Sequence, residues 1–180
     1  LRNWAALFFP PHSSFHSMHE YIAWTITLVR WGDVHVRLHA FFLFAAASVL
    51  LACQSSANVS MIWLAVLGIL VLAASVALHA AGHAYAAARL GMRMELLVIG
   101  PVGDFADEVR HFDPRAQLIF GFAGPIANIL LAVACLPAVL LLGGSSFLSV
   151  INPLVLPTEL STESLWLIAL RLAFWMNWTL

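Results

Sequence analysis

The sequence predicts an all-α polytopic membrane protein with about four transmembrane helices and a small β-hairpin on the cytoplasmic side. The 180 residues are 62% hydrophobic and only 9% charged, whereas soluble domains are roughly 45–50% apolar and about 25% charged. The charges are also confined to a few segments. No Asp, Glu, Lys or Arg occurs between Arg37 and Arg89, or between Arg115 and Glu159. A helix that crosses a bilayer needs about 20 apolar residues, and these two gaps are long enough to contain such helices.

The apolar runs place the predicted elements along the chain. Residues 1–38 are predicted to form an N-terminal interfacial segment, and residues 39–180 the transmembrane core. The first helix is expected at 39–54 and the second at 61–88, which carries a tryptophan near its start, as is typical of a membrane interface. The third helix is expected at 116–142 and the fourth at 164–180, where the given sequence interrupts it.

The connection at 89–115 has a different composition from the apolar runs around it. Glycines punctuate it, and most of the acidic residues of the chain gather there. The segment 94–99 has the apolar, β-branched character of a strand, and 105–109 is predicted to pair back on it as a hairpin.

Arginine placement predicts the orientation of the chain. Seven arginines flank one side of the predicted bundle, and the turns on the other side have none. The positive-inside rule therefore predicts an integral membrane protein whose N-terminus and 89–115 segment are cytoplasmic. A net charge of −1 without any lysine excludes nucleic acid as a main partner. The expected partners are the lipid bilayer and a membrane-spanning protein.

The second predicted helix contains two histidines at helical spacing. His79 and His83 are at i and i+4, so they project from one helix face and can hold one metal ion together. Ala80 occupies the position that glutamate takes in the His-Glu-x-x-His pattern of zinc proteases. Two structural histidines that bond neighbouring carbonyls are the alternative. Ionisable residues within a membrane are costly and are functional by default, which favours the metal site.

Four segments in order resemble the site-2 protease family of intramembrane zinc metalloproteases. The stretch 78–93 is similar to the family's His-Glu-x-Gly-His-Ala motif and the Ala-Arg-x-x-Gly that follows it. The other matches are a glycine-led approach at 32–39, a glycine-rich segment at 99–106 and an Ala-Gly-Pro-x-x-Asn motif at 123–130. The resemblance covers about residues 32–142, and the four matches together are more specific than any one of them.

The resemblance implies a zinc site and also two departures from it. It assigns His79 and His83 as zinc ligands, and Ala80 to the position of the general base, where a methyl group cannot transfer a proton. The family's third ligand is an aspartate, which is expected beyond Leu180, so the zinc site in this chain is expected to be weak or incomplete. Asn128 would lie near the metal and bind a substrate carbonyl.

Several alternatives remain open at this point. Ala80 is either the native residue of a non-catalytic pseudoprotease that binds membrane proteins or an engineered inactivation; Asp104 in the glycine-rich segment slightly favours the first. The strand around Leu97, with Gly103 after it, either offers an edge to an extended substrate or only seals the site. A small transporter subunit is a weaker third hypothesis, suggested by a proline in the third helix and Arg171 in the fourth.

Overall fold

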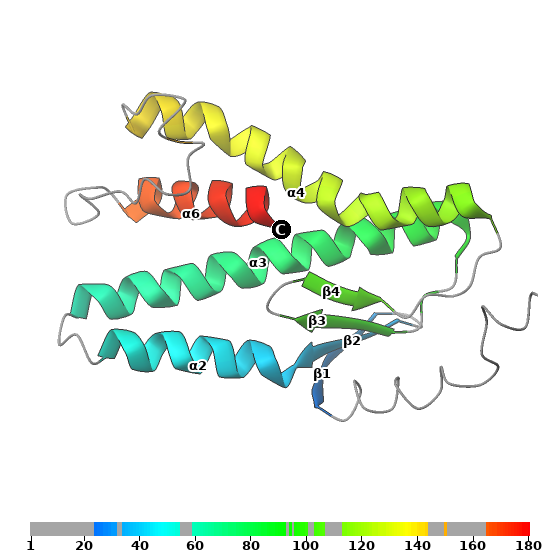
Figure 1. Cartoon of the computed structure of the whole chain (residues 1–180), viewed down its shortest axis with the longest axis horizontal. Helices are drawn as coiled ribbons and strands as arrows, with labels where there is room; N and C mark the ends of the chain where they lie inside the picture. Colours follow the sequence, from blue (N-terminus) through cyan, green and yellow to red (C-terminus); the bar gives the residue numbers. More distant parts are fainter. Residues whose placement is uncertain are drawn as a thin grey trace, which may run out of the picture.

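The computed structural model describes residues 24–31, 34–54, 59–92, 94, 96–100, 103–106, 113–143, 150 and 165–180. Within these residues, four strands and four helices follow one another in the chain (Figure 1). Their order is β1 (Thr25–Trp31), β2 (Val34–His39), α2 (Ala40–Gln54), α3 (Val59–Leu90), β3 (Leu96–Gly100), β4 (Gly103–Ala106), α4 (Pro114–Gly143) and α6 (Leu165–Thr179).

Helix α3 is the central element of the fold. It contacts α2, α4, α6 and both strands β3 and β4. Figure 1 shows α2 beside the first half of α3 and the sheet beside its second half, with α4 and α6 on the opposite side. The second half of α3 therefore lies between α4 and the sheet.

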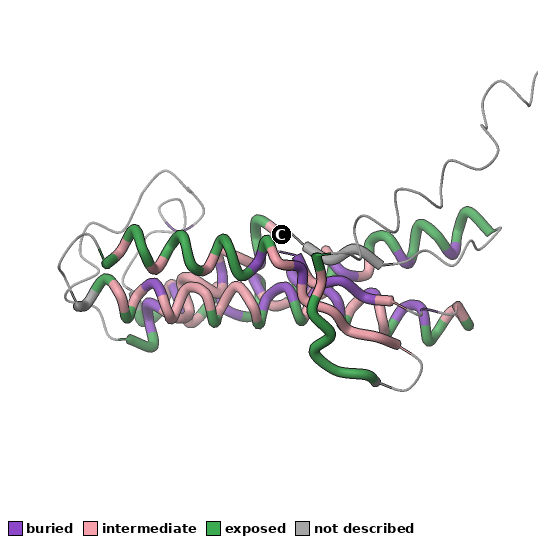
Figure 2. Tube along the Cα trace, turned by 90° about the horizontal axis from the view of Figure 1, so that it is seen from below, coloured by how far each residue is buried: buried purple, intermediate pink, exposed green. Residues whose placement is uncertain are grey.

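Two helices are long and apolar enough to cross a membrane. They are Met61–Leu90, with 30 residues, and Pro114–Leu142, with 29 residues, while α2 is a shorter apolar helix. Figure 2 shows that buried positions gather in the middle of the bundle and that exposed positions follow its outer faces. On α4 this outer face carries large apolar side chains such as Phe122, Leu130 and Leu141, and an extended apolar surface suits lipid better than water. The mostly helical architecture agrees with the prediction. That all four helices cross the membrane remains a prediction.

The sheet is larger than the sequence predicted. Instead of one hairpin it has four strands in the order β1-β2-β3-β4. The predicted hairpin is present as the antiparallel pair β3–β4, although β4 begins at Gly103 rather than at 105. Strand β2 pairs antiparallel with β1 and parallel with β3. Residues 25–31 and 34–39 therefore form two strands that were not predicted, and the interfacial position of the N-terminal segment remains a prediction.

These strands were not predicted because β2 pairs with a strand that is distant in the sequence. His35 is opposite Leu96 and Leu38 is opposite Ile99, on strands that α2 and α3 separate in the sequence. No turn motif in the sequence predicts a parallel pair of strands, because a long crossover connects the two strands. The alternation of Val34, Val36 and Leu38 with polar residues is nevertheless typical of a strand.

A glycine turn ends α3 and leads the chain into the sheet. Gly91 has a φ of 66°, a left-handed conformation that glycine adopts without strain. The amide of Met92 donates to the carbonyl of Ala87 over 2.9 Å, which is the hydrogen bond of a Schellman cap. This cap positions β3 against the second half of α3.

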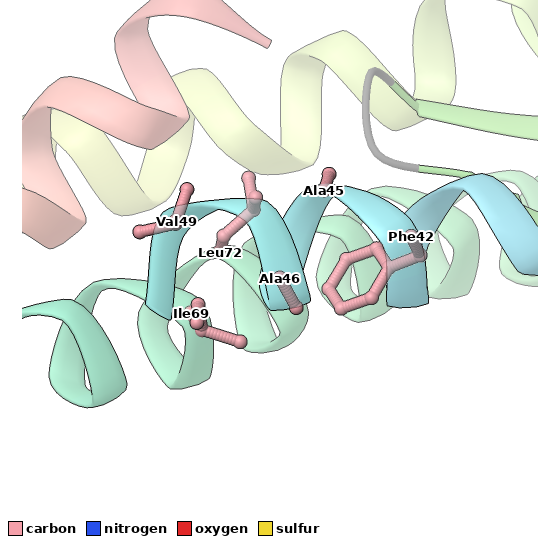
Figure 3. A pocket seen from close by; sticks show the side chains of 6 residues that line it. All are labelled: Phe42, Ala45, Ala46, Val49, Ile69 and Leu72. Carbon is pink, nitrogen blue, oxygen red and sulfur yellow. The ribbon is translucent and has the colours of Figure 1, made fainter. Parts of the chain in front are cut away.

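The described core has two apolar clusters. The first joins α3, α4 and the sheet and consists of Ala80, Ala86, Ala87, Met94, Leu97 and Phe120. The second joins α4 and α6 around Val139 and Phe174. Between α2 and α3 lies a small cavity lined only by apolar side chains (Figure 3), namely Phe42, Ala45, Ala46, Val49, Ile69 and Leu72.

Candidate metal centre

The structure brings the two predicted metal ligands together. His79 and His83 lie on α3 with about 8% of their surface exposed. Their Nε2 atoms are 3.2 Å apart. Two nitrogens that share one tetrahedral zinc ion are about 3.3 Å apart, because each Zn–N bond is roughly 2.0–2.1 Å. The pair therefore has the spacing of two ligands of one metal ion.

Helix α4 holds the other nitrogen of each imidazole. Nδ1 of His83 lies 2.8 Å from the carbonyl oxygen of Phe120. Nδ1 of His79 lies 3.1 Å from the side-chain nitrogen of Asn128. Partners on the far side of a ligating histidine fix its tautomer and ring orientation. Both rings are thus anchored from α4, and both Nε2 atoms are directed toward each other.

Two glycines allow α3 and α4 to approach closely at this point. A β carbon on Gly82 would lie 2.5 Å from the carbonyl oxygen of Ala123, which no side chain tolerates. A β carbon on Gly124 would lie 2.5 Å from Nε2 of His79 and closer still to Nε2 of His83. The missing side chain of Gly124 therefore leaves free the space next to both candidate ligand atoms.

The donor set fits part of a zinc site. Neutral imidazoles suit zinc, and a structural or catalytic zinc site takes three or four protein ligands. In the described residues no group of three or more His, Cys, Asp or Glu side chains could hold a metal ion. The described part of the chain thus offers two candidate ligands. The side-chain oxygen of Asn128 is buried without a hydrogen-bond partner among the described residues.

Ala80 lies in the apolar core rather than at the surface. It is 2% exposed and belongs to the apolar cluster that also contains Leu97 and Phe120. The methyl group that is present can neither accept nor donate a proton.

The predicted substrate-binding residues have different environments. Asn128 is fully buried and its amide faces His79, so it contacts a candidate ligand rather than an open surface. Leu97 is 5% exposed and packs in the core. Its strand β3 has neighbours on both sides, so β3 cannot offer a free edge, and that hypothesis was wrong. Gly103 begins β4, the outer strand of the described sheet.

Other contacts of α3 with its neighbouring helices carried little signal in the sequence. The Phe120 contact uses a backbone carbonyl, which every residue has, so no residue type could announce it. Asn177 of α6 donates to Ser75 over 2.8 Å, one helical turn before His79. The spacing of Ser75, His79 and His83, each four residues apart, was the available signal that one polar face of α3 meets its neighbours.

Comparisons with known proteins agree with this fold and pattern of motifs. No known family model matches the chain. A curated zinc metalloprotease of Methanocaldococcus jannaschii is 32% identical over 114 residues, which are 63% of this chain and 32% of that protein. The chain thus spans about a third of the length of this relative.

A solved structure, the site-2 protease from Methanocaldococcus jannaschii, is similar to this one with a TM-score of 0.59. The match covers 85% of this chain and 62% of that chain, at 17% sequence identity. The two structures therefore share a fold over the matched residues. The fold is that of the site-2 proteases, and both comparisons support the family that the sequence motifs indicated.

Proposed function

We propose that this chain forms the metal-binding core of an intramembrane zinc metalloprotease-like protein that acts on membrane-spanning substrates. The observation that carries the proposal is the histidine pair, with two Nε2 atoms 3.2 Å apart. Both Nδ1 atoms are held by α4. The pair lies between two helices that are long and apolar enough to cross a membrane.

Each residue of the centre has a separate task in this proposal. His79 and His83 bind the ion, and a zinc ion here would supply Lewis-acid activation of a carbonyl and of water. The Phe120 carbonyl and the Asn128 amide orient the two imidazoles. Position 80 is the place of the proton-transferring group. Since general acid–base catalysis contributes about 10²–10⁴ in rate, the chain with Ala80 should cleave peptides inefficiently.

A non-catalytic pseudoprotease that binds membrane proteins is the second candidate. The packing of Ala80 favours it, because the methyl group is 2% exposed within a continuous apolar cluster. In the described sheet β4 is an outer strand, and an extended segment of a partner can add to the outer strand of a sheet through main-chain hydrogen bonds. In this case the partner is again a membrane-spanning protein, but it is bound and not cleaved.

The proposed orientation has the N-terminus in the cytoplasm. Arg89 lies in the last turn of α3, and Arg115 is the second residue of α4. The end of α3 and the start of α4 lie at the same end of the bundle (Figure 1). This clustering supports the positive-inside argument. The candidate metal centre would then lie toward the cytoplasmic side of the membrane.

The two candidates are separated by restoring a base at position 80. We would compare Ala80→Glu with Ala80→Gln, which has the same size and no base, in nanodiscs with zinc and a membrane-spanning peptide. Both forms are continued after Leu180 by an aspartate-containing turn that supplies a third ligand. The protease proposal predicts cleavage by the Glu form, at least about 10²-fold faster than by the Gln form.

Absence of cleavage, or of zinc binding, would lead to a different conclusion. If both forms bind zinc and the peptide, and neither cleaves it, the pseudoprotease is the better description. If neither form binds zinc, the metal site itself is rejected.

A further inference from the structure

The side-chain amide of Asn128 is in an unusual position for a buried group. It is fully buried within α4. Its nitrogen lies 3.1 Å from Nδ1 of His79, and its oxygen has no hydrogen-bond partner among the described residues. Buried polar atoms are nearly always paired, so an orphaned acceptor next to a candidate ligand needs an explanation.

The direction of each hydrogen bond in the centre follows from one backbone atom. The carbonyl oxygen of Phe120 can only accept, so Nδ1 of His83 carries a proton. Nε2 of neutral His83 then has no proton and carries a lone pair, so it can only accept. It lies 3.2 Å from Nε2 of His79, which donates to it.

The same logic fixes the orientation of the Asn128 amide. If the proton of neutral His79 is on Nε2, its Nδ1 is an acceptor and requires a donor. The amide nitrogen of Asn128, which faces Nδ1, is that donor. The three hydrogen bonds thus form one chain from Asn128 through both imidazoles to the Phe120 carbonyl.

Metal binding requires the opposite tautomer of His79. An ion shared by the two histidines needs a lone pair on both Nε2 atoms. The proton of His79 must then be on Nδ1, and Nδ1–H requires an acceptor. The oxygen of Asn128 becomes that acceptor when the amide turns by half a rotation, which exchanges the positions of its oxygen and nitrogen: the oxygen gains the His79 contact and the nitrogen gives it up.

We propose that Asn128 is a positioning residue that sets the tautomer of His79, and that its amide turns over when a divalent metal such as zinc binds the histidine pair. This proposal rests on the proposed metal site. Water takes the proton that leaves Nε2 and returns one to Nδ1, so the net number of protons on the ring is unchanged. Neither helix has to move, because the 3.2 Å separation suits both the hydrogen bond and the shared ion.

Asparagine is suited to this task because its side chain offers both a donor and an acceptor. Leucine has nearly the same shape and offers neither. An aspartate carboxylate accepts only, which favours Nδ1–H even without metal. The variants Asn128→Leu and Asn128→Asp therefore test the two halves of the proposal separately.

The experiment is nitrogen NMR of the chain labelled with ¹⁵N-histidine, in detergent micelles, with and without zinc. The ring-nitrogen shifts report which atom of His79 carries the proton. For the unmodified chain we expect Nε2–H without zinc and Nδ1–H with zinc. For Asn128→Asp we expect Nδ1–H already without zinc.

Zinc affinity gives an independent measurement. Loss of an outer partner of a ligating histidine weakens metal binding about 10–100-fold, and we expect a loss in this range for Asn128→Leu. The Asp variant should bind zinc at least as tightly as the unmodified chain. The matched control is Asn177→Leu, which removes an equally buried amide that does not contact the pair and should leave zinc affinity unchanged.

The outcomes distinguish the two proposals. If the unmodified chain binds zinc but His79 has the same tautomer with and without it, the role of Asn128 is rejected and the metal site stands. Equal zinc affinity of Asn128→Leu and the unmodified chain has the same meaning. If the unmodified chain binds no zinc, the proposed function fails, and the metal-linked switch fails with it.

Discussion

Nδ1 of His83 lies 2.8 Å from the main-chain carbonyl oxygen of Phe120, so a backbone atom of α4 holds an imidazole of α3 in place. A side-chain substitution does not remove this partner. The geometry of the pair depends instead on how closely the two helices approach, which Gly82 and Gly124 permit.

Gly124→Ala should weaken zinc binding although it removes no ligand. The added methyl group would lie 2.5 Å from Nε2 of His79 and even closer to Nε2 of His83. It would occupy space beside the ligand atoms or push α4 away from α3. We expect at least a tenfold loss of zinc affinity, in the range of outer-partner substitutions, measured by competition with a chelating dye.

Gly121→Ala is the matched control for that measurement. This glycine is one turn earlier on α4, and a β carbon there would meet nothing within 4 Å. Its zinc affinity should equal that of the unmodified chain. If both variants bind zinc as the unmodified chain does, Gly124 does not border the metal site.

Gly82→Ala should destabilise the helix bundle. Its β carbon would lie 2.5 Å from the carbonyl oxygen of Ala123 and 3.0 Å from the β carbon of Ala127. Overpacking of this kind costs roughly 1–3 kcal/mol. Unfolding of the detergent-solubilised chain, followed by circular dichroism, would measure the loss.

Gly68→Ala, on the same helix, should not destabilise the bundle. The nearest atom to its β carbon would be the Cε of Met176 at 4.0 Å, an ordinary contact. Since alanine has a higher helix propensity than glycine by up to about 1 kcal/mol, this variant should be neutral or more stable. A similar loss of stability in both variants would contradict the close α3–α4 approach.

The orientation of the chain can be tested by cysteine labelling. After replacement of Cys53 and Cys135, single cysteines at Ser56 or Ser145 should react with an impermeant reagent added outside the cell. A cysteine at Asp107 should not react, because the arginine distribution places that segment in the cytoplasm. Labelling at 107 from outside, without labelling at 56, would reverse the orientation and move the metal centre to the other leaflet.

The sequence was most informative about the helices. Charge-free apolar runs are a direct consequence of the cost of charge in lipid, and the four predicted segments coincide with α2, α3, α4 and α6 to within a few residues. The strands β1 and β2 were missed, because β2 finds its parallel partner β3 only after two helices have intervened. Local patterns cannot specify such pairing.

For the site, the sequence predicted which residues take part but not how they contact one another. Spacing in the sequence predicted that His79 and His83 share a helix face, and the structure has their Nε2 atoms 3.2 Å apart. The environment of Asn128 could not be predicted, because the motif indicated proximity to the histidines and not contact with Nδ1 of His79. The contribution of Phe120 is a carbonyl group, which no sequence pattern distinguishes.

The central claim is that His79 and His83 together bind a metal ion, and zinc content measures this most directly. We would load the purified chain, His83→Ala and the control His35→Ala with zinc, remove free metal and determine zinc per chain by elemental analysis. His35 lies on β2, opposite Leu96, and forms no metal-binding group with the pair among the described residues. We predict weak but measurable zinc in the unmodified chain and in His35→Ala, and clearly less in His83→Ala. Equal zinc content in the unmodified chain and His83→Ala would contradict the account.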